Sequence, residues 1–255
     1  MIRLDQLLVE KGLFASRSRA RDAIIRGTVQ VQDAVVTKPG MAVPETVAIS
    51  VDDPASRYVS RAALKLIAGL DHFSVDVKGR TALDIGASTG GFTQVLLERG
   101  ADHVIAVDVG HGQMHDSLRR DERVSNLEGL NARSVTRDHL DGRKVDLVVS
   151  DVSFISLKLA LPPALELADP GAPCVLLVKP QFEAGREAIG KGGILRDPKD
   201  GIRVANDLRD WLEGLPGWSA LGLCPSPIEG GDGNREFLLV GLKRKEKIDE
   251  YARND

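Results

Sequence analysis

Apolar residues recur every three or four positions over the first 25 residues of the chain, in two groups separated by a polar stretch. This spacing places each group on one face of a helix and predicts two short helices. Ser16 and Ser18 lie where the second helix would begin, and Gly27 would end it. The positions that carry the pattern are Leu4, Leu7, Leu8, Ala20, Ile24 and Ile25.

The pattern changes after Gly27 to short apolar runs that are typical of strands. A tight turn is predicted at Asp33 and Ala34, between the first two runs. Two helices followed by a small group of strands make a unit of about fifty residues, which is near the lower size limit for independent folding. The predicted strands are 28–32, 34–40 and 47–53.

A polar segment with a proline, 52–57, predicts a linker between a small α+β domain, 1–51, and the rest of the chain. Beyond it, strand patterns alternate with helical ones until two final strands follow each other directly. This order predicts an α/β domain over 58–245 with a doubly wound, Rossmann-like, mainly parallel sheet and an antiparallel last strand. A charged tail follows at 246–255. Strands are expected at 81–86, 103–110, 124–130, 145–151, 174–179, 218–227 and 235–243. Helices are expected at 57–73, 91–100, 112–120, 156–168, with a break near Pro162 and Pro163, and 200–215.

The composition, 42% hydrophobic and 28% charged, is sufficient for a buried core. The net charge is −3, so any nucleic-acid binding must come from a local patch rather than from the field of the whole protein. Cys174 and Cys224 are too few for a disulfide framework and fit buried small hydrophobes. The first residues lack the pattern of a secretion signal and no apolar run has membrane length, so we expect a cytoplasmic protein.

The segment "LDIGASTGGF", residues 83–92, follows a predicted strand and opens a helix. Its glycines permit a tight turn and the close approach of a ligand, although a turn that only packs a helix on a sheet has the same pattern. Asp84 could order this loop and hold a cationic ligand. Asp108 ends the next strand, where an acid can accept hydrogen bonds from ribose hydroxyls.

Ser88 stands where dinucleotide-binding loops carry their second glycine, which disfavours the close passage of a pyrophosphate. S-adenosylmethionine has a ribose and no phosphate, and it fits the pattern better. Asn131, after the third strand, is either a contact on the adenine side or a plain turn residue. The predicted cofactor-binding residues are Asp84, Gly86, Ser88, Thr89, Gly90, Gly91, Phe92, Asp108, Asn131 and Asp151.

Four ionisable residues lie at or beside the ends of predicted elements. Asp151 and Lys179 end the fourth and fifth strands, at the edge where such sheets bind ligands. Lys65 lies on the flank of the apolar stripe of the helix before the first strand, and Glu236 begins the last strand. Each of them alone has a purely structural explanation, as a lysine whose ammonium group reaches solvent or as an acid at a strand end. Together they make a possible catalytic set.

These four residues, with "LDIGASTGGF" and "SDVSF", resemble the RrmJ/FtsJ class of ribose 2′-O-methyltransferases. Residues 3–40 resemble the S4-like (alpha-L) RNA-binding motif. The two in this order resemble the TlyA family, historically called hemolysins, over nearly the whole chain. "DPASRYVSRAALKL" and "LVKPQFEAGRE" are the most family-specific stretches. The resemblance implies a cytidine of the large-subunit (23S) rRNA as target, with the small-subunit (16S) rRNA as a second target in some members.

The expected chemistry is removal of a proton from a ribose hydroxyl. Burial and a second ammonium lower the pKa of a lysine whereas nearby carboxylates raise it, so four such groups titrate as a coupled set. We expect Lys179 to accept the proton, Asp151 and Lys65 to orient the hydroxyl, and Glu236 to hold the lysines. The five histidines show no ligand spacing, and no metal is expected.

Basic residues outnumber acidic ones in residues 1–40, seven against the four acids Asp5, Glu10, Asp22 and Asp33, which predicts the RNA-binding surface. Arg17 and Arg21 are four positions apart on one helix face, a spacing suited to phosphates, although a solvated basic face would look the same. Phe14 is the single aromatic residue there, so we expect RNA to be held by its backbone and shape. The predicted RNA-binding residues are Arg3, Lys11, Arg17, Arg19, Arg21, Arg26 and Lys38.

Two further functions compete with the enzyme. One is a non-catalytic RNA-binding or ribosome-assembly protein that retains the methyltransferase fold, and cofactor binding without turnover would favour it. The other is a membrane-lytic hemolysin, which no long apolar segment or secretion signal supports.

Overall fold

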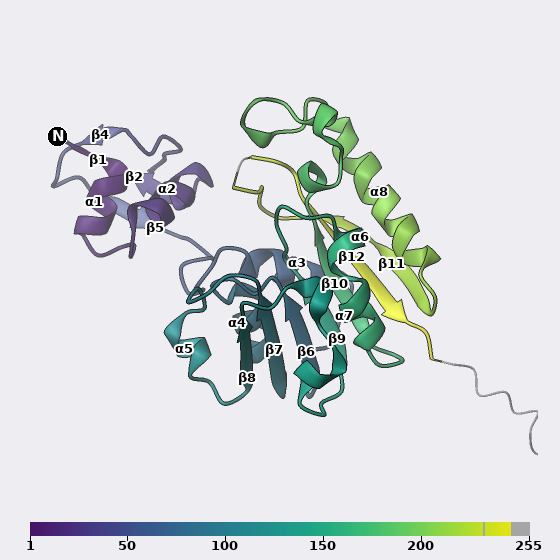
Figure 1. Ribbon diagram of the computed structural model, residues 1–255. Coiled ribbons are helices and arrows are strands. Elements are labelled where there is room, and N and C mark those ends of the chain that lie inside the picture. The colour runs from purple at the N-terminus through teal and green to yellow at the C-terminus, as the bar shows by residue number, and fades with distance from the viewer. Residues whose placement is uncertain (232, 246–255) are drawn as a thin grey trace, which may run out of the picture. The chain divides into compact units, whose positions relative to one another are not determined.

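The computed structural model describes residues 1–231 and 233–245, and the predicted charged tail, 246–255, lies outside the described residues. The chain divides into two compact units, one of residues 1–57 and one from Tyr58 onward (Figure 1). Each unit has hydrophobic core residues of its own.

The first unit packs two helices against short strands. Leu8 and Ile24 are fully buried in its core. Ile25, predicted on the apolar face, is 58% exposed, and Ala23 is buried in its place, because a residue directly after the apolar stripe turns away from the core. The elements are α1 (Leu4–Glu10), α2 (Arg17–Ile25), a sheet of β3 (Ala34–Val35), β2 (Val29–Val31) and β5 (Ile49–Val51), and a pair of β1 (Ile2–Arg3) with β4 (Ala42–Val43).

The turn between β2 and β3 lies one residue earlier than predicted. Val31 pairs with Ala34, so the two loop residues are Gln32 and Asp33, with φ of 51° and 63°. Positive φ at both central positions gives the turn that matches strand twist in a two-residue hairpin. Asp33 is the one residue here that favours turns, and it does not indicate whether the second turn residue precedes or follows it.

The predicted linker is folded onto the first unit. Arg26 donates two hydrogen bonds to Asp53, at 2.8 and 2.9 Å, and the backbone N–H of Ala55 donates to the same carboxylate at 2.9 Å. Asp53 and Ala55 are buried. A polar, proline-containing segment is therefore ordered by contacts with the first unit that composition does not reveal.

The second unit is built on a seven-stranded sheet with the order β11-β12-β10-β9-β6-β7-β8 (Figure 1). β12 runs antiparallel to both of its neighbours, which confirms the predicted antiparallel last strand. It lies between β10 and β11 rather than at the edge of the sheet. The strands are β6 (Thr81–Ile85), β7 (His103–Asp108), β8 (Val124–Glu128), β9 (Leu147–Ser150), β10 (Pro173–Val178), β11 (Trp218–Pro225) and β12 (Phe237–Lys243).

Helices flank the sheet, and apolar residues fill both of its faces. Leu83 and Ile85 of β6 pack in one core, and Ala82 of the same strand packs in the other, as expected for a strand covered on both sides. The helices are α3 (Ala63–His72), α4 (Gly91–Glu98), α5 (Asp116–Arg119), α6 (Leu157–Ala160), α7 (Pro162–Leu167) and α8 (Lys199–Gly214), with short 3-10 helices η1 (Ala132–Ser134), η2 (Arg137–Leu140), η3 (Pro180–Phe182), η4 (Arg186–Ala188) and η5 (Lys191–Gly193).

The first helix of this unit begins at Ala63, later than the predicted 57. Residues 58–62 form turns instead. The Val59 N–H donates to the side chain of Gln94 at 2.8 Å, and the Ala62 N–H donates to Ser60 Oγ at 3.2 Å. Side chains therefore satisfy backbone groups that a longer helix would have used.

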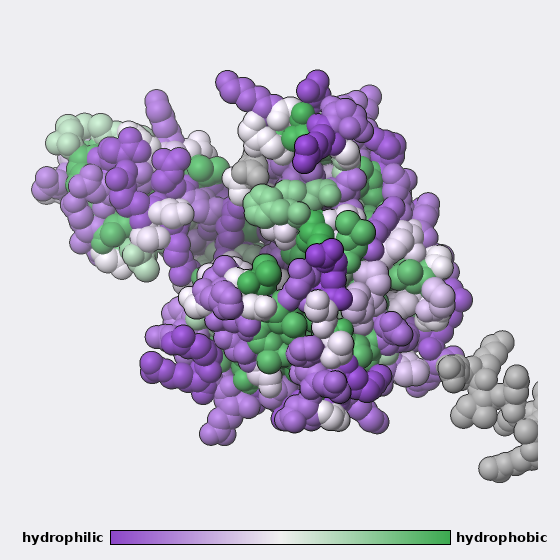
Figure 2. Space-filling model, viewed as in Figure 1, coloured by the Kyte–Doolittle hydropathy of each residue, from purple (hydrophilic) through white to green (hydrophobic). Residues whose placement is uncertain are grey.

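The face of the molecule in Figure 2 is mostly hydrophilic, with hydrophobic residues gathered in smaller areas. Within residues 1–231 and 233–245, no helix combines the length and the apolar character that a membrane crossing needs.

Replacing Arg26 by Met should destabilise the first unit by about 3–5 kcal/mol, because it leaves the buried Asp53 carboxylate without its partner. The measurement is native-state hydrogen exchange of the β2 and β5 amides, which isolates this unit from the other. Asp52→Asn, a change at an exposed neighbouring position, is the control and should move exchange by less than about 0.5 kcal/mol. Equal protection in the Arg26 variant and the wild type would contradict the structural role.

Candidate active site

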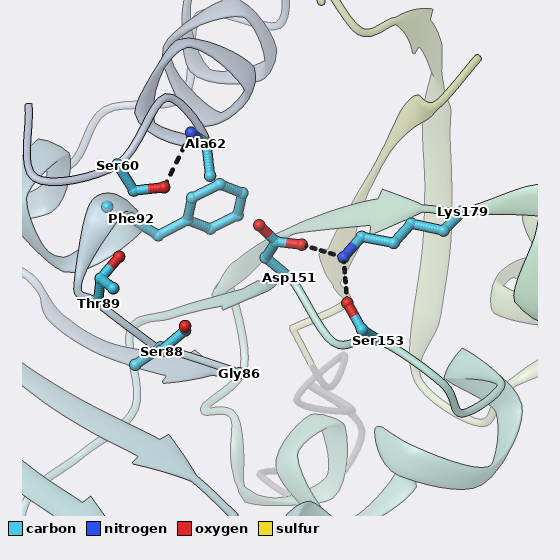
Figure 3. Close-up of a pocket in the computed structure, with 11 residues that line it drawn as sticks. Ser60, Ala62, Gly86, Ser88, Thr89, Phe92, Asp151, Ser153 and Lys179 are labelled. Atoms are coloured by element: carbon cyan, nitrogen blue, oxygen red, sulfur yellow. Dashed lines mark hydrogen bonds and ion pairs between the residues drawn. The ribbon is translucent and has the colours of Figure 1, made fainter. Parts of the chain in front are cut away.

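A pocket of about 130 Å³ opens at the carboxyl edge of the sheet, where β6, β9 and β10 end. Figure 3 shows Lys179 reaching toward Asp151 and Ser153, with the loop residues Ser88 and Thr89 in the same pocket. The lining residues are Ser60, Ala62, Gly86, Ala87, Ser88, Thr89, Gly91, Phe92, Asp151, Ser153 and Lys179. Six predicted cofactor residues therefore line one pocket, and they are Gly86, Ser88, Thr89, Gly91, Phe92 and Asp151.

The glycines of this loop are required by close packing. Gly86 has φ of 86°, and a Cβ there would lie 2.8 Å from the carbonyl oxygen of Asp151. A Cβ on Gly91 would lie 2.8 Å from the side chain of Ser60. The loop is thus pressed against its neighbours, and it also lines the pocket. The structure therefore shows the packing role that the glycine pattern left open, and ligand binding by the loop stays a prediction.

Asp84 lies under the loop with no exposed surface. Its Oδ2 accepts a 2.7 Å hydrogen bond from the Thr93 hydroxyl, and its Oδ1 has no hydrogen-bond partner among the described residues. Burial raises the pKa of Asp84 to about 7, with smaller contributions from the charges of Asp151 and Asp108. Asp84 does not line the pocket. Its carboxylate would attract a cationic ligand electrostatically from beneath the loop, without touching it.

Asp108 fastens the glycine loop to the end of β7. Its Oδ2 accepts from the Ser88 N–H at 2.8 Å, and its Oδ1 accepts from the Gly110 N–H at 2.7 Å. A carboxylate has about four acceptor positions, so capacity remains for hydroxyl groups of a ligand.

Glu128 has a similar role that the sequence patterns did not predict. Its carboxylate accepts hydrogen bonds from the N–H groups of Gly112, Gln113 and Met114, at 2.6, 3.1 and 3.2 Å. These backbone hydrogen bonds lower the pKa of Glu128 to about 2. The detectable signal was its position, as an acid at the end of the third parallel strand.

The four ionisable residues that the sequence singled out form two pairs. Lys179 Nζ lies 2.6 Å from Asp151 Oδ1, an ion pair that does not meet hydrogen-bond angles, and donates to Ser153 Oγ at 2.7 Å. Lys65 on α3 contacts Glu236, which directly precedes β12, and both are buried. Asp151 and Lys179 line the pocket, whereas Lys65 and Glu236 do not.

The loops that carry Asp151 and Lys179 are fastened to each other beyond this ion pair. Glu183 accepts hydrogen bonds from the Ser156 hydroxyl at 2.6 Å and from the Leu157 N–H at 2.7 Å. The rings of Phe154 and Phe182 lie 5.0 Å apart. Ser153 and Glu183 were not predicted. Ser153 lies in "SDVSF" with Asp151, and Glu183 lies in "LVKPQFEAGRE" with Lys179.

Other predicted positions have different surroundings. Asn131 accepts from the Arg133 N–H at 3.0 Å, caps η1 and does not line the pocket. Arg26, expected on the RNA-binding surface, has a side chain that is only 12% exposed and is bound to Asp22 and Asp53, so the structure gives it a structural contact and little surface for RNA. Its burial could not be foreseen, since Asp53 is 27 positions away.

The remaining basic residues of the first unit are accessible to different degrees. Arg3, Lys11, Arg17, Arg21 and Lys38 are exposed, and Arg19 is partly buried, with its guanidinium donating to the Ala55 carbonyl at 3.4 Å. No group of three or more potential metal ligands occurs in the described part of the chain.

Comparisons with known proteins match each of the two units to a protein family. Residues 58–243 match the model of the FtsJ-like methyltransferases, and residues 2–49 match the S4 domain. A Mycobacterium tuberculosis protein named 16S/23S rRNA (cytidine-2′-O)-methyltransferase TlyA is 46% identical over 93% of this chain and 88% of its own length. Hemolysin A of Brachyspira hyodysenteriae is 38% identical over 93% of this chain and 98% of its own.

A solved structure is also similar to this chain over nearly its whole length. A hemolysin-named protein from Streptococcus thermophilus has a TM-score of 0.74 and 39% identity, and the match covers 95% of this chain and 88% of that one. The fold and the order of the two units are thus shared with proteins named both for rRNA methylation and for hemolysis.

The pKa of Asp84 predicts how stability depends on pH. The pKa of Asp84 in the folded protein, about 7, lies above the 3.8 of an unperturbed aspartate, so the folded protein keeps the proton longer and loses stability as pH rises from about 4 to 7. Asp84→Asn should remove this loss, so its stability relative to the wild type should rise over that range by up to about 4 kcal/mol.

Thr93→Val provides the opposite perturbation, because it removes the hydrogen bond that stabilises the charged carboxylate. The loss of stability should then extend to higher pH. Denaturant unfolding from pH 4 to 8 measures both variants. Parallel pH profiles for Asp84→Asn and the wild type would show that Asp84 is ionised throughout.

Proposed function

The chain belongs to the FtsJ-like methyltransferase family, in the TlyA group that joins this domain to an S4 domain, and we propose that it methylates the ribose 2′-hydroxyl of cytidine in ribosomal RNA with S-adenosylmethionine. The observation that carries this proposal is the Lys179–Asp151 pair in the wall of a pocket whose other wall is the glycine loop. The large-subunit (23S) rRNA is the proposed substrate, with the small-subunit (16S) rRNA as the second candidate. A protein that acts on ribosomal RNA works where ribosomes are, so we assign it to the cytoplasm.

The residues present fit S-adenosylmethionine. Asp84, Asp108 and Asp151 surround the loop with negative charge, and Lys179, the basic residue in the pocket lining, is already paired. Such a site favours a cation without phosphates over a dinucleotide. Residues 86–92 would hold the cofactor, with Asp108 available to ribose hydroxyls and Asn131 on the adenine side. When bound, the cofactor supplies an electrophilic methyl group.

Lys179 is suited to take the proton of the ribose hydroxyl. Besides its carbon, Nζ has three positions. One donates to Ser153, and the Asp151 carboxylate lies 2.6 Å away as an ion pair. A remaining position is left for the substrate oxygen, either as an N–H that orients it or, on the neutral amine, as the lone pair that accepts its proton. Asp151 and Ser153 keep the nitrogen in place in both states, and the proton ends on Nζ.

Lys65 and Glu236 support this arrangement from the side. Their pair is buried and joins α3 to the start of β12, next to the strand that ends in Lys179. A Cβ on Gly230 would come within 2.6 Å of Glu236 Oε1, so the chain closes tightly around the carboxylate. We assign Lys65 to orientation of the hydroxyl and Glu236 to holding Lys65 in place.

The direct test is ribose-methylation mapping of rRNA from cells with and without this chain, followed by methyl transfer with the purified protein on each ribosomal subunit. Loss of one or more 2′-O-methyl cytidines without the chain, and their restoration in vitro, is the expected outcome. Binding of cofactor and RNA without turnover would favour the assembly-protein alternative. Lysis of cells by the purified protein in the absence of methyl transfer would favour the hemolysin.

Lys179→Arg should lower the single-turnover methyl-transfer rate by about 10²–10⁴-fold, because arginine keeps the charge but cannot accept the proton. Cofactor affinity measured by calorimetry should change little. Lys158→Arg, at an exposed position on α6, is the matched control and should keep the wild-type rate. A folded Lys179→Arg protein with near-normal rate would remove the proton-acceptor role.

Asp108→Asn should weaken S-adenosylmethionine binding by about 1–3 kcal/mol, because the ribose hydroxyls lose a charged acceptor. Isothermal titration calorimetry measures it, and Asp116→Asn on α5, exposed and paired with Arg119, is the control. Unchanged affinity in Asp108→Asn would place the ribose elsewhere.

A further inference from the structure

A buried carboxylate in the first unit lies at the centre of three arginines. Asp5 has no exposed surface. Arg3 donates to both of its oxygens at 3.0 Å, Arg17 donates to Oδ2 at 3.1 Å, and a guanidinium nitrogen of Arg21 lies 4.0 Å from the same oxygen. These three arginines come from β1 and from two turns of α2, so the acid joins separate elements.

The guanidinium groups remain accessible although the acid is not. The side chains of Arg3, Arg17 and Arg21 are 46%, 53% and 52% exposed. Asp5 uses three of their N–H groups in hydrogen bonds, whereas three guanidiniums carry about fifteen in all. Asp5 therefore leaves most of these donors unused, in a half-exposed cluster with a net charge of +2.

The backbone also shapes this cluster. A Cβ on Gly40 would lie 2.9 Å from Nη1 of Arg3, so the turn that carries Gly40 packs directly against this guanidinium. The same turn is bound to α1, since the Asp5 N–H donates to the Pro39 carbonyl at 3.1 Å. Arg3 is thus held from two sides, and a side chain at position 40 would displace it.

The Asp5 carboxylate compensates only one of the three positive charges, so the cluster still attracts a further anion. A stability argument alone does not explain the arrangement, because burying an ion pair contributes little net stability. The geometry has a clear use, however. A long, flexible side chain loses entropy when it binds, and a guanidinium that is already fixed loses less.

We propose that Asp5 is a positioning residue that arranges Arg3, Arg17 and Arg21 into one preformed binding site for a backbone phosphate of the RNA substrate. The inference rests on the proposed function, since it assumes that the substrate is RNA. It reverses the role that charge counting gives Asp5, which enters that count as one of the acids opposing RNA binding. Bidentate guanidinium contacts to phosphate oxygens are strong, which makes the site a geometric anchor rather than a diffuse patch.

The test exploits the sign of the charge change. Asp5→Asn removes one negative charge from the RNA-binding unit, and simple electrostatics predicts tighter RNA binding. The positioning role predicts weaker binding, by about five- to tenfold for one disordered phosphate contact, and a salt dependence shallower by roughly one unit of slope. Binding of the full-length protein to an rRNA fragment is measured between 50 and 200 mM salt (roughly the range over which such contacts respond).

Glu10→Gln is the matched control, because it removes the same charge from the same helix. Glu10 is exposed and accepts a hydrogen bond from Gln6. This variant should bind RNA as tightly as the wild type or slightly more tightly. If Asp5→Asn behaves like Glu10→Gln, charge alone governs binding and the positioning role is wrong.

A double-mutant cycle separates positioning from general support of the fold. Arg17→Gln and Asp5→Asn should each weaken binding, and the double variant should be no weaker than the worse single one, because Asp5 acts through Arg17. Additive losses would overturn the proposal. Hydrogen exchange of α1 and α2 reports whether Asp5→Asn is folded. If it is not, Arg17→Lys, which keeps the charge and loses the planar fork, takes its place and should also weaken binding.

Two further measurements distinguish a failure of this inference from a failure of the proposed function. Inorganic phosphate added at constant ionic strength should not displace RNA, and effective displacement would mean that the site takes a free anion instead. Methyl transfer by the wild-type protein is measured on the same RNA. If it occurs while Asp5→Asn binds normally, the proposed function stands and the inference alone fails.

Discussion

A lysine at the end of a fully buried strand imposes the main constraint on the second unit. β10 is buried along its whole length, and Lys179 follows it directly. Its ammonium cannot remain unpaired there without a large cost in free energy. Asp151, delivered to the same edge by the neighbouring parallel strand β9, provides the counter-charge, and Ser153 provides the hydrogen bond. The ends of β9 and β10 are therefore joined by the groups that we assign to the chemistry.

The glycine loop depends on the same edge. It packs against the backbone of Asp151 at Gly86 and is held by Asp108 through the Ser88 N–H. Beneath it, Asp84 is buried and one of its oxygens has no hydrogen-bond partner in the part of the chain that the structure describes, at a cost to stability near neutral pH. Such a cost is common where negative charge is concentrated for a ligand, because the field that binds a cation also destabilises the empty site.

The first unit uses a buried acid in the opposite way. Asp53 is paired with Arg26 to hold the segment that follows β5, and this pair is almost inaccessible. Asp5 is equally buried, yet its three arginines remain half exposed. Two acids of similar burial thus have different consequences. A buried partner cation makes the contact purely structural, whereas exposed partner cations remain available for binding.

The sequence alone determined the strand and helix order of the second unit, the antiparallel last strand and seven of the eleven residues that line the pocket at the sheet edge. These follow from local periodicity and from the rule that parallel strands end at a common edge. Tertiary structure decided which charges pair. Lys65 meets Glu236 across 171 positions, and Arg26 meets Asp53 across 27. It also decided that Asn131 caps η1, that Arg26 is enclosed by two acids, and that β12 lies inside the sheet. Spacing along a chain reports which face a residue occupies, whereas long-range packing determines which partner it finds there.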